Sequence, residues 1–472
     1  MPESPESQTP LQQPTGSPGT GRVELPFLLI VGLAVVLLAA LWASGLLVGR
    51  ASIDTPSYFG GTRSAGLWGA SRHPLYGALA VWLGATAEAP GHIALVQALL
   101  HVAAALSLYG GSRVAGLRPT GAALLSAAAL VAQSALFHVP LLVPESAANA
   151  FLLLAFAGVL AASRAARLLW LLLIPIAAVT AMVYLLRPAS LPAILVLPVL
   201  FFIFAKRNAD RRLRLHTLCL LVAIALPFLV QAGIRQRAVG DFNIVSYGGF
   251  QMSALAGLML RPETVTRLPA SVQATAQAIL AARNAGEAEG RITPTPFNSV
   301  GERSFSSAAI GYFDIYARTY DDLLREIAKL RRPGESWVAF NRRLMAFAFA
   351  TVATSPLQWA AWIGGATARL AGRSLITNAV TLLALVVLGL TAVPATWRRS
   401  GLGPSAGDIA PIAVIALAWL AATGPLIVVI TYPATRYIDT AGILLPAVPA
   451  VLAAAMIEGL RAGAPAGISS RA

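Results

Sequence analysis

The chain contains a series of apolar runs, each long enough to cross a membrane as a helix. A transmembrane helix needs about 20 mostly apolar residues, and ten such runs lie near residues 25–49, 91–110, 120–139, 145–163, 168–186, 189–205, 215–234, 375–396, 409–431 and 440–459. Charged residues make up 12% of the chain, about half of the roughly 25% found in soluble domains. The sequence therefore predicts an all-α polytopic membrane protein with a bundle of ten transmembrane helices.

Two apolar segments need a closer reading. The run at 25–49 is too long for the hydrophobic part of a signal peptide, and no clear small-residue cleavage site follows it, so we expect a retained first helix. Residues 345–365 are also apolar, but Pro356 and the evenly spaced Trp359 and Trp362 favour an interfacial or re-entrant segment. If this segment crosses the membrane, the bundle has eleven helices.

The basic residues predict how the protein is oriented. Short cytoplasmic loops of membrane proteins are enriched in Lys and Arg. With the N-terminus inside, the cytoplasmic loops and tail hold Arg113, Arg118, Arg164, Arg167, Lys206, Arg207, Arg211, Arg212, Arg214, Arg398, Arg399, Arg461 and Arg471. The short outer loops hold Arg50, Arg63, Arg72, Arg187 and Arg436. The net charge of +15 is therefore read as a topology signal in a bacterial inner membrane, and we expect no nucleic-acid partner.

The same topology divides the chain into five parts. These are a disordered cytoplasmic N-terminus (1–22), an N-terminal transmembrane module (23–234) with its first outer loop (50–90), an extracytoplasmic loop domain with the interfacial segment (235–370), C-terminal transmembrane helices (371–460) and a cytoplasmic tail (461–472). The stretch 235–345 holds 24 of the 55 charged residues, and loops this long usually carry function. Within it, 311–332 has the pattern of an amphipathic helix.

Ionisable residues at the outer boundary are candidates for function, because charge at membrane depth is costly. Asp54 follows the first helix, and Glu145 opens the fourth. Each also has a structural interpretation, since Asp54 precedes Pro56 in a turn-like sequence and a first-turn Glu interacts favourably with the helix dipole. Arg187 and Arg436 lie in outer connections, where a guanidinium either extends to lipid headgroups or binds a phosphate. The outer histidines His73 and His138 are more often structural than catalytic.

The missing motifs narrow the function further. The chain has no phosphate-binding P-loop, dinucleotide fingerprint, H-E-x-x-H metal motif or nucleophile elbow. The single Cys219 lies in an apolar run, so a disulfide framework or cysteine metal site is excluded. Chemistry driven by a soluble nucleotide is therefore not expected.

Several short motifs share one side of the membrane and follow a recognisable order. They are Asp54 with Tyr58, Arg72-His73-Pro74-Leu75-Tyr76, Glu145, Leu186-Arg187-Pro188, Ser246-Tyr247-Gly248-Gly249 and Arg436-Tyr437. In this order the chain, from about residue 25 to 460, resembles the GT-C glycosyltransferases, polytopic enzymes that use polyprenyl-phosphate sugars. The nearest branches are those similar to protein O-mannosyltransferases and to lipid A aminoarabinose transferases. Those branches often carry Asp-Glu in the first loop, where this chain has Asp54-Thr55, so the acceptor class stays open.

The resemblance implies a mechanism and a set of site residues. A sugar passes from a polyprenyl-phosphate donor to a hydroxyl of a glycan, lipid or protein on the extracytoplasmic face, with inversion. Asp54 acts as general base, Glu145 assists it or orients the acceptor, and Arg187 and Arg436 bind the donor phosphate. The remaining substrate-binding residues are Tyr58, Arg72, His73, Tyr76 and Tyr437. Asp54 and Glu145 also supply two oxygen ligands, which allow a divalent metal ion without establishing one.

Two other functions remain open. A polysaccharide polymerase or O-antigen ligase would use a pyrophosphate-linked donor and rely on Arg and His in the long outer loop, but 235–345 contains no histidine. A transporter of lipids or solutes would carry ionisable groups in the middle of helices and repeated, broken helices, whereas no internal repeat is visible here. The transferase interpretation further predicts that Asp54, Glu145, Arg187 and Arg436 line one outward-facing cavity.

Overall fold

The computed structural model describes residues 24–52, 54–59, 72–86, 89–132, 136–208, 210–292, 313–376, 404–430 and 441–463. Within these ranges the chain forms helices and no strands, apart from one isolated bridge between Arg50 and Leu141. Seven of the described helices are long and apolar enough to cross a membrane, or eight if one bent pair counts as a span. The prediction of an all-α polytopic membrane protein is therefore confirmed, whereas the count of ten spans is not reached among the described residues.

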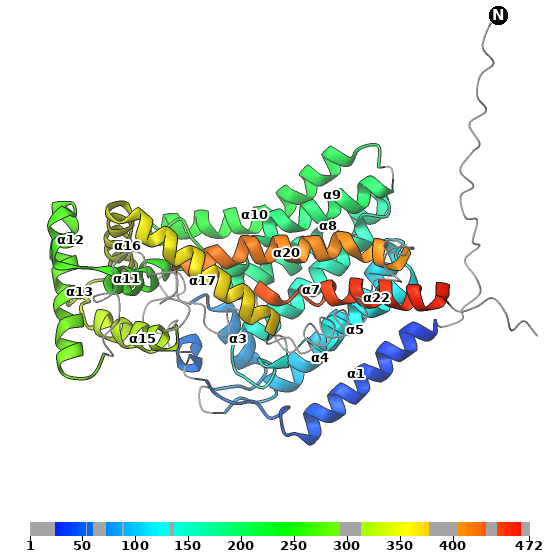
Figure 1. The fold of residues 1–472 in the computed structure, drawn as a ribbon, viewed down its shortest axis with the longest axis horizontal. Helices are drawn as coiled ribbons and strands as arrows, with labels where there is room; N and C mark the ends of the chain where they lie inside the picture. Colours follow the sequence, from blue (N-terminus) through cyan, green and yellow to red (C-terminus); the bar gives the residue numbers. More distant parts are fainter. Residues whose placement is uncertain are drawn as a thin grey trace, which may run out of the picture.

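Most of the helices form one elongated bundle (Figure 1). Its helices are α1 (Leu25–Ala43), α3 (Leu75–Trp82), α4 (Ile93–Val114), α5 (Pro119–Leu130), α7 (Glu145–Ala162), α8 (Ala166–Leu186), α9 (Ala193–Arg207), α10 (Leu213–Val239), α20 (Pro404–Ile430) and α22 (Ala447–Gly463). A short 3-10 turn, η1 (Pro188–Ser190), joins α8 to α9. Small residues allow close packing of α4 and α7: a Cβ atom on Gly111 of α4 would clash with the Ala157 carbonyl oxygen of α7. Such small residues let membrane helices approach closely.

The expected span at 120–139 is interrupted. Helix α5 ends at Leu130 after 12 residues, and turns and an isolated bridge lie between it and α7 among the described residues. Two buried side chains of α4 contact backbone carbonyl groups around this interruption. Gln97 donates to the Val139 and Leu141 oxygens at 2.9 and 3.0 Å, and His101 Nε2 lies 3.0 Å from the Leu130 oxygen. Partners inside the protein are what irregular backbone needs where a chain crosses a membrane.

Two further expected spans are shorter than predicted or are not described. Helix α22 begins only after Pro446 and has 17 residues, while residues 377–400, with most of the expected run at 375–396, lie outside the described residues.

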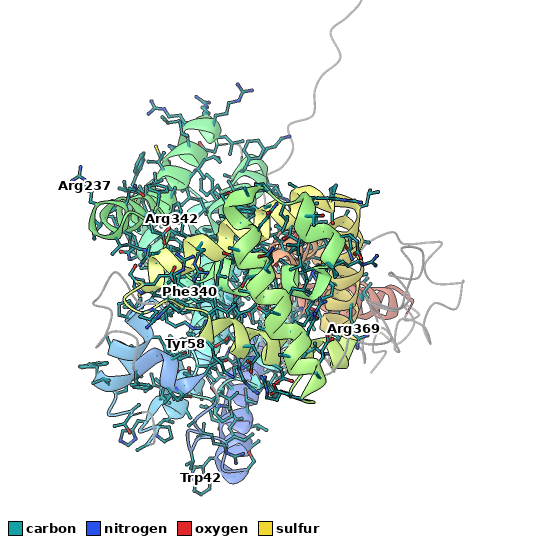
Figure 2. The ribbon with its side chains drawn as sticks, turned by 90° about the vertical axis from the view of Figure 1, so that its left-hand side faces the viewer. Trp42, Tyr58, Arg237, Phe340, Arg342 and Arg369 are labelled. Carbon is teal, nitrogen blue, oxygen red and sulfur yellow. The ribbon has the colours of Figure 1, made fainter. Side chains whose placement is uncertain are left out.

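A second group of helices covers one end of the bundle. We call it the cap domain: residues 248–292 and 313–354, with α11 (Gly248–Met259), α12 (Pro262–Arg267), α13 (Ala270–Ala288), α15 (Phe313–Lys329) and α16 (Trp337–Thr354). The amphipathic helix expected at 311–332 is confirmed as α15, which buries Tyr320, Leu323 and Ile327 in the core of this domain. Viewed from that end, the cap-domain helices lie in front of the bundle, and Tyr58 lies beside them (Figure 2).

The segment around Pro356 is bent, as its sequence suggests. Helix α16 ends at Thr354, α17 (Pro356–Ile376) follows, and the two axes differ by 101°. A proline at the start of a helix lacks only an N–H that would be unpaired anyway, which explains why α17 begins there. Trp359 and Trp362 are buried, and the Trp362 indole donates to the Val428 oxygen of α20 at 2.8 Å. Trp362 therefore links α17 to α20, and both tryptophans belong to a core that α17 and α20 share with the cap domain. The bend is compatible with the re-entrant segment that the sequence suggests.

The two ends of the bundle differ in their charged residues. At the end away from the cap domain, Arg113 pairs with Glu24, and Arg207 lies 3.5 Å from Asp408. The N-terminus of α7 and the C-termini of α8 and α20 lie at the opposite end, near the cap domain (Figure 1). Basic residues predicted to be cytoplasmic thus meet at one end, while the first turn of α7, which carries Glu145, lies at the other.

Candidate functional site

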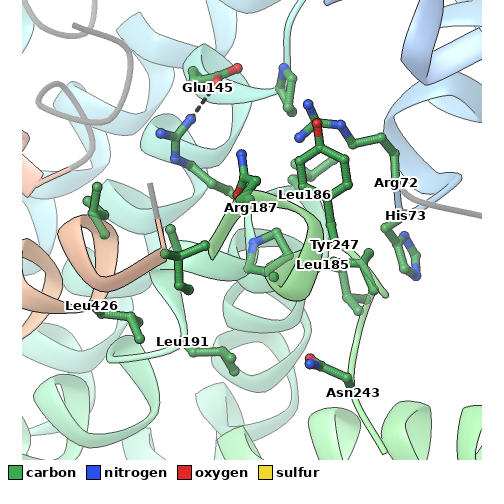
Figure 3. A pocket seen from close by; sticks show the side chains of 18 of the residues that line it. Arg72, His73, Glu145, Leu185, Leu186, Arg187, Leu191, Asn243, Tyr247 and Leu426 are labelled. Carbon is green, nitrogen blue, oxygen red and sulfur yellow. Dashed lines mark ion pairs between the residues drawn. The ribbon is translucent and has the colours of Figure 1, made fainter. Parts of the chain in front are cut away.

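A cavity of about 310 Å³ lies at the cap-domain end of the bundle. Its polar wall contains Tyr58, Arg72, His73, Glu145, Arg187, Asn243, Tyr247 and Gln251. Its apolar wall contains Leu185, Leu186, Leu191, Leu426, Ile427 and Ile430, from α8, the turn before α9, and the end of α20. Figure 3 shows Glu145 and Arg187 on one side of the cavity and Arg72 and His73 on the other. A cavity with charged and apolar walls suits a ligand that has both kinds of surface.

The Glu145–Arg187 ion pair joins two transmembrane helices at the cavity wall. Helix α7 begins at Glu145, directly after Pro144, so the Glu145 carboxylate lies in the first turn of this helix. Arg187 follows the last residue of α8 in an extended conformation, just before Pro188. Arg187 Nη1 lies 2.5 Å from Glu145 Oε1, and the two side chains are 6% and 5% exposed. Glu145 Oε2 faces no hydrogen-bond partner among the described residues. The site therefore holds a buried ion pair in which one carboxylate oxygen can still accept a hydrogen bond. Burying this oxygen costs free energy, which a hydrogen bond from a ligand would offset.

Arg72 forms the charged centre of the opposite wall. Its guanidinium lies 4.5 Å from the centre of the Tyr247 ring and 5.4 Å from that of Tyr58. Arg72 Nη2 also lies 3.8 Å from Asp54 Oδ1, and these side chains are 21% and 22% exposed. Aromatic faces stabilise a cation through the negative charge of the π system. Two tyrosines from distant parts of the chain thus hold Arg72 at the cavity.

Asp54 does not itself line the cavity. Hydrogen bonds in the surrounding loop fix the backbone of Asp54. Ser57 Oγ donates to the backbone carbonyl oxygen of Asp54 at 2.6 Å, and Thr55 Oγ1 donates to the backbone carbonyl oxygen of Leu142 at 3.1 Å. Its carboxylate reaches the Arg72 guanidinium, which does line the cavity. The expectation that Asp54, Glu145, Arg187 and Arg436 share one cavity wall therefore holds for Glu145 and Arg187. Asp54 stands one side chain behind that wall, and Arg436 lies outside the described residues.

His73 lines the cavity as a neutral side chain. Its Nδ1 accepts a hydrogen bond from the Leu75 N–H at 3.2 Å, and its Nε2 lies 3.3 Å from Gln231 Nε2. Burial, together with the nearby charge of Arg235, lowers the pKa of His73 to about 4. At neutral pH the ring therefore adds no positive charge to the cavity.

Of the remaining predicted residues, Tyr76 has a supporting role. Its side chain is buried, its hydroxyl lies 3.5 Å from Gln97 Oε1, and its ring packs edge-on against Tyr58 at 5.3 Å. Burial raises the pKa of Tyr76 well above its usual range. Tyr76 thus supports Tyr58 from behind the cavity wall. Tyr437 lies outside the described residues.

The chemistry of the carboxylates does not favour a metal ion. In the described part of the chain, no three His, Cys, Asp or Glu side chains gather in a way that could hold one. The two carboxylates suggested as ligands face different arginines, Glu145 facing Arg187 and Asp54 facing Arg72. We therefore assign no step to a metal.

The structure adds a cluster that the sequence analysis missed. Arg235, which is 2% exposed, donates to Asp241 Oδ2 at 3.1 Å and to Ser246 Oγ at 2.6 Å. The Trp337 indole N–H donates to the backbone carbonyl oxygen of Ser246. This cluster fixes the segment 241–247, which carries Tyr247 into the cavity wall. One signal was present: Gly240 ends α10 with a left-handed φ of 70°, which turns the next residue, Asp241, back toward the last turn.

Comparisons of the chain with protein-family models, with curated proteins and with solved structures find no match. The functional assignment therefore depends on the site itself and on the order of motifs in the sequence.

Proposed function

We propose that the protein is an integral membrane glycosyltransferase that moves a sugar from a polyprenyl-phosphate donor to an acceptor hydroxyl. The observation that carries this proposal is one cavity, at the end of a transmembrane bundle, that combines two arginines with a wall of leucine and isoleucine side chains. A polyprenyl phosphate needs both features, because its phosphate is anionic and its tail is a hydrocarbon. The GT-C-like order of Asp54, Arg72, Glu145 and Arg187 supports the same function.

The arginines suit the departing phosphate. Guanidinium groups bind phosphate oxygens through paired, charge-assisted hydrogen bonds. Arg187 is buried and held in place by Glu145, so it needs little reorganisation to stabilise negative charge as that charge develops on the leaving group. Arg72 faces it from the other wall (Figure 3). We assign Arg436 the same role by its place in the sequence.

The transfer itself needs a base. The acceptor hydroxyl oxygen attacks the anomeric carbon, the bond from that carbon to the phosphate oxygen breaks, and polyprenyl phosphate leaves with the bonding electron pair. The hydroxyl proton passes to a carboxylate. Attack from the side opposite the phosphate inverts the configuration.

Asp54 suits this base role better than Glu145 does. Protonating Glu145 would leave the buried Arg187 without its counter-charge, which is strongly unfavourable. Asp54 is about one-fifth exposed, and its arginine lies at the longer distance of 3.8 Å. A positioned general base accelerates such a step by about 10²–10⁴-fold. Glu145 then positions Arg187 and offers Oε2 to an acceptor hydroxyl.

The distribution of charge suggests which face of the membrane carries the reaction. Arg113 and Arg207 pair with acidic side chains at the end of the bundle away from the cavity, and the backbone N–H of Arg118 donates to Asp408 Oδ2 there. Because Lys and Arg are enriched in cytoplasmic loops, that end is assigned to the cytoplasm of a bacterial cell. The cavity and the cap domain then face the extracytoplasmic side, where glycans of the cell envelope, lipids and secreted proteins offer hydroxyl groups.

The test is transfer of a labelled sugar from polyprenyl-phosphate donors by membranes that contain wild-type protein or Asp54→Asn. We expect Asp54→Asn to lower the initial rate by about 10²-fold or more, because the variant removes the base. Glu24→Gln is the matched control, since it changes a carboxylate at the other end of the bundle and should keep the wild-type rate. Unchanged transfer by Asp54→Asn would remove Asp54 from the chemistry.

A further inference from the structure

Both arginines of the cavity in the described part of the chain are already neutralised by carboxylates. Arg187 faces Glu145, and Arg72 faces Asp54. His73 adds no charge at neutral pH, because burial and Arg235 keep its pKa low. These five side chains together are therefore close to electrically neutral. An anionic ligand that enters must compete with a carboxylate for at least one arginine.

The two pairs are unequal in strength. Arg187 and Glu145 are separated by 2.5 Å and are about 5% exposed, whereas Arg72 and Asp54 are separated by 3.8 Å and are about one-fifth exposed. A short buried pair is costly to break, since it leaves an uncompensated charge in a medium of low polarity. A long, partly exposed pair contributes little. A phosphate group therefore displaces Asp54 more easily than Glu145.

The surroundings of Arg72 fit such an exchange. The rings of Tyr58 and Tyr247 keep its guanidinium at the cavity wall. A ring face attracts the cation as a whole and leaves the N–H donors at the guanidinium edge to oxygen ligands. The Arg235–Asp241–Ser246 cluster holds the segment with Tyr247 in place. Arg72 can thus change its anionic partner without leaving its aromatic contacts.

We propose that the phosphate group of the donor takes Arg72 from Asp54, so that donor binding releases the general base. This inference rests on the proposed function and adds an order to it. Without the donor, Asp54 is held by Arg72 behind the cavity wall. With the donor bound, Arg72 no longer holds the carboxylate, which turns toward the acceptor hydroxyl. Activation of the acceptor therefore follows donor binding.

The exchange predicts that removing the charge of Asp54 strengthens phosphate binding. The experiment measures the affinity of purified full-length protein in lipid nanodiscs for a polyprenyl monophosphate. Asp54→Asn, which has nearly the same shape, should bind about threefold tighter, the scale of a partly exposed ion pair. Arg72→Gln should bind roughly tenfold weaker, because it removes a charged hydrogen-bond donor. Arg72→Lys should recover part of that loss.

The double variant separates the exchange from a general effect of charge. In the Arg72→Gln background, Asp54→Asn should no longer tighten binding, since its effect passes through Arg72. Equal or weaker binding by Asp54→Asn overturns the proposal, and so does equal tightening in both backgrounds. Polyprenol without phosphate should bind wild type and all the variants alike, and a dependence on Asp54 there would also overturn the proposal.

Inorganic phosphate provides the second arm of the experiment. We expect it to follow the same order of variants at much lower affinity, because it lacks the tail that the apolar wall binds. If it binds as tightly as the polyprenyl phosphate, with the same dependence on Asp54 and Arg72, the exchange holds but the lipid-linked donor of the proposed function is wrong. Failure of the exchange and failure of the function are thus distinguishable.

Discussion

The two ends of the bundle each carry a pair of glutamate and arginine that joins two elements, yet the pairs differ in their surroundings. Arg113 and Glu24 are 31% and 36% exposed, whereas Arg187 and Glu145 are 6% and 5% exposed and line a cavity. Water screens the first pair, so it contributes little to stability. The second pair is nearly shielded from water, where burying charged groups costs free energy. Such buried charges are therefore candidates for function. The same residue types thus form a partly exposed pair at one end and a buried pair at a cavity wall at the other.

The strongest way to break this comparison is to remove one carboxylate from each pair. Glu145→Gln should lower the free energy of unfolding by about 3 kcal/mol, because it leaves Arg187 buried without a counter-charge. Glu24→Gln should lower it by about 0.5 kcal/mol, as expected for a partly exposed pair. Denaturant titrations in detergent micelles would measure both.

A double change sharpens the result for the buried pair. Glu145→Met combined with Arg187→Met should recover much of the lost stability, since both charges are then gone. Similar losses for Glu145→Gln and Glu24→Gln would show that the cavity end does not differ from the other end in the way described.

A smaller effect is expected at the aromatic contacts of Arg72. Tyr247→Ala should weaken binding of a polyprenyl monophosphate about fivefold, because it removes a ring face that stabilises the cation at the cavity wall. Tyr247→Phe keeps the ring and should stay within about twofold of wild type. The affinity measurement in nanodiscs serves here as well, and an equal loss in both variants would exclude the ring face as the cause.

The smallest expected effect is a dependence of stability on pH that originates at His73. The folded protein holds the pKa of His73 at about 4, whereas the unfolded chain has the ordinary value near 6.5. Between these values the unfolded chain binds more protons, so stability falls as the pH is lowered from 6.5 toward 4. His73→Gln should show a smaller decline over this range in thermal unfolding. An identical decline in both proteins would assign the effect to other groups.

The sequence predicts much of the fold because membrane helices are encoded locally. Residues 145–163 and 168–186 were predicted as spans and correspond to α7 and α8 within two residues. Glu145 and Arg187 could be identified because each stands beside a proline at the end of an apolar run. The break in the run at 120–139 could not, because it depends on Gln97 and His101 of a neighbouring helix.

The rest of the site depends on contacts between distant parts of the chain. The Arg72 guanidinium lies over the ring of Tyr247, which is 175 positions later in the sequence. No local sequence pattern predicts that contact. Asp54 was predicted at the cavity from its place after the first helix, but Arg72 stands between the two. Arg235 resembled the other basic residues at helix ends, and its buried contacts with Asp241 and Ser246 arise only when the chain turns at Gly240.

The lipid product of the reaction tests the central claim most directly. Purified protein in nanodiscs is supplied with an acceptor-containing extract of bacterial cell envelope and with sugars on polyprenyl phosphate or polyprenyl pyrophosphate. Mass spectrometry then identifies the lipid that is released. We predict release of polyprenyl monophosphate, together with a transferred sugar of inverted configuration, by wild type and not by Asp54→Asn. Transfer from the pyrophosphate-linked donor alone, with release of polyprenyl diphosphate, would contradict the account and favour a polymerase or ligase.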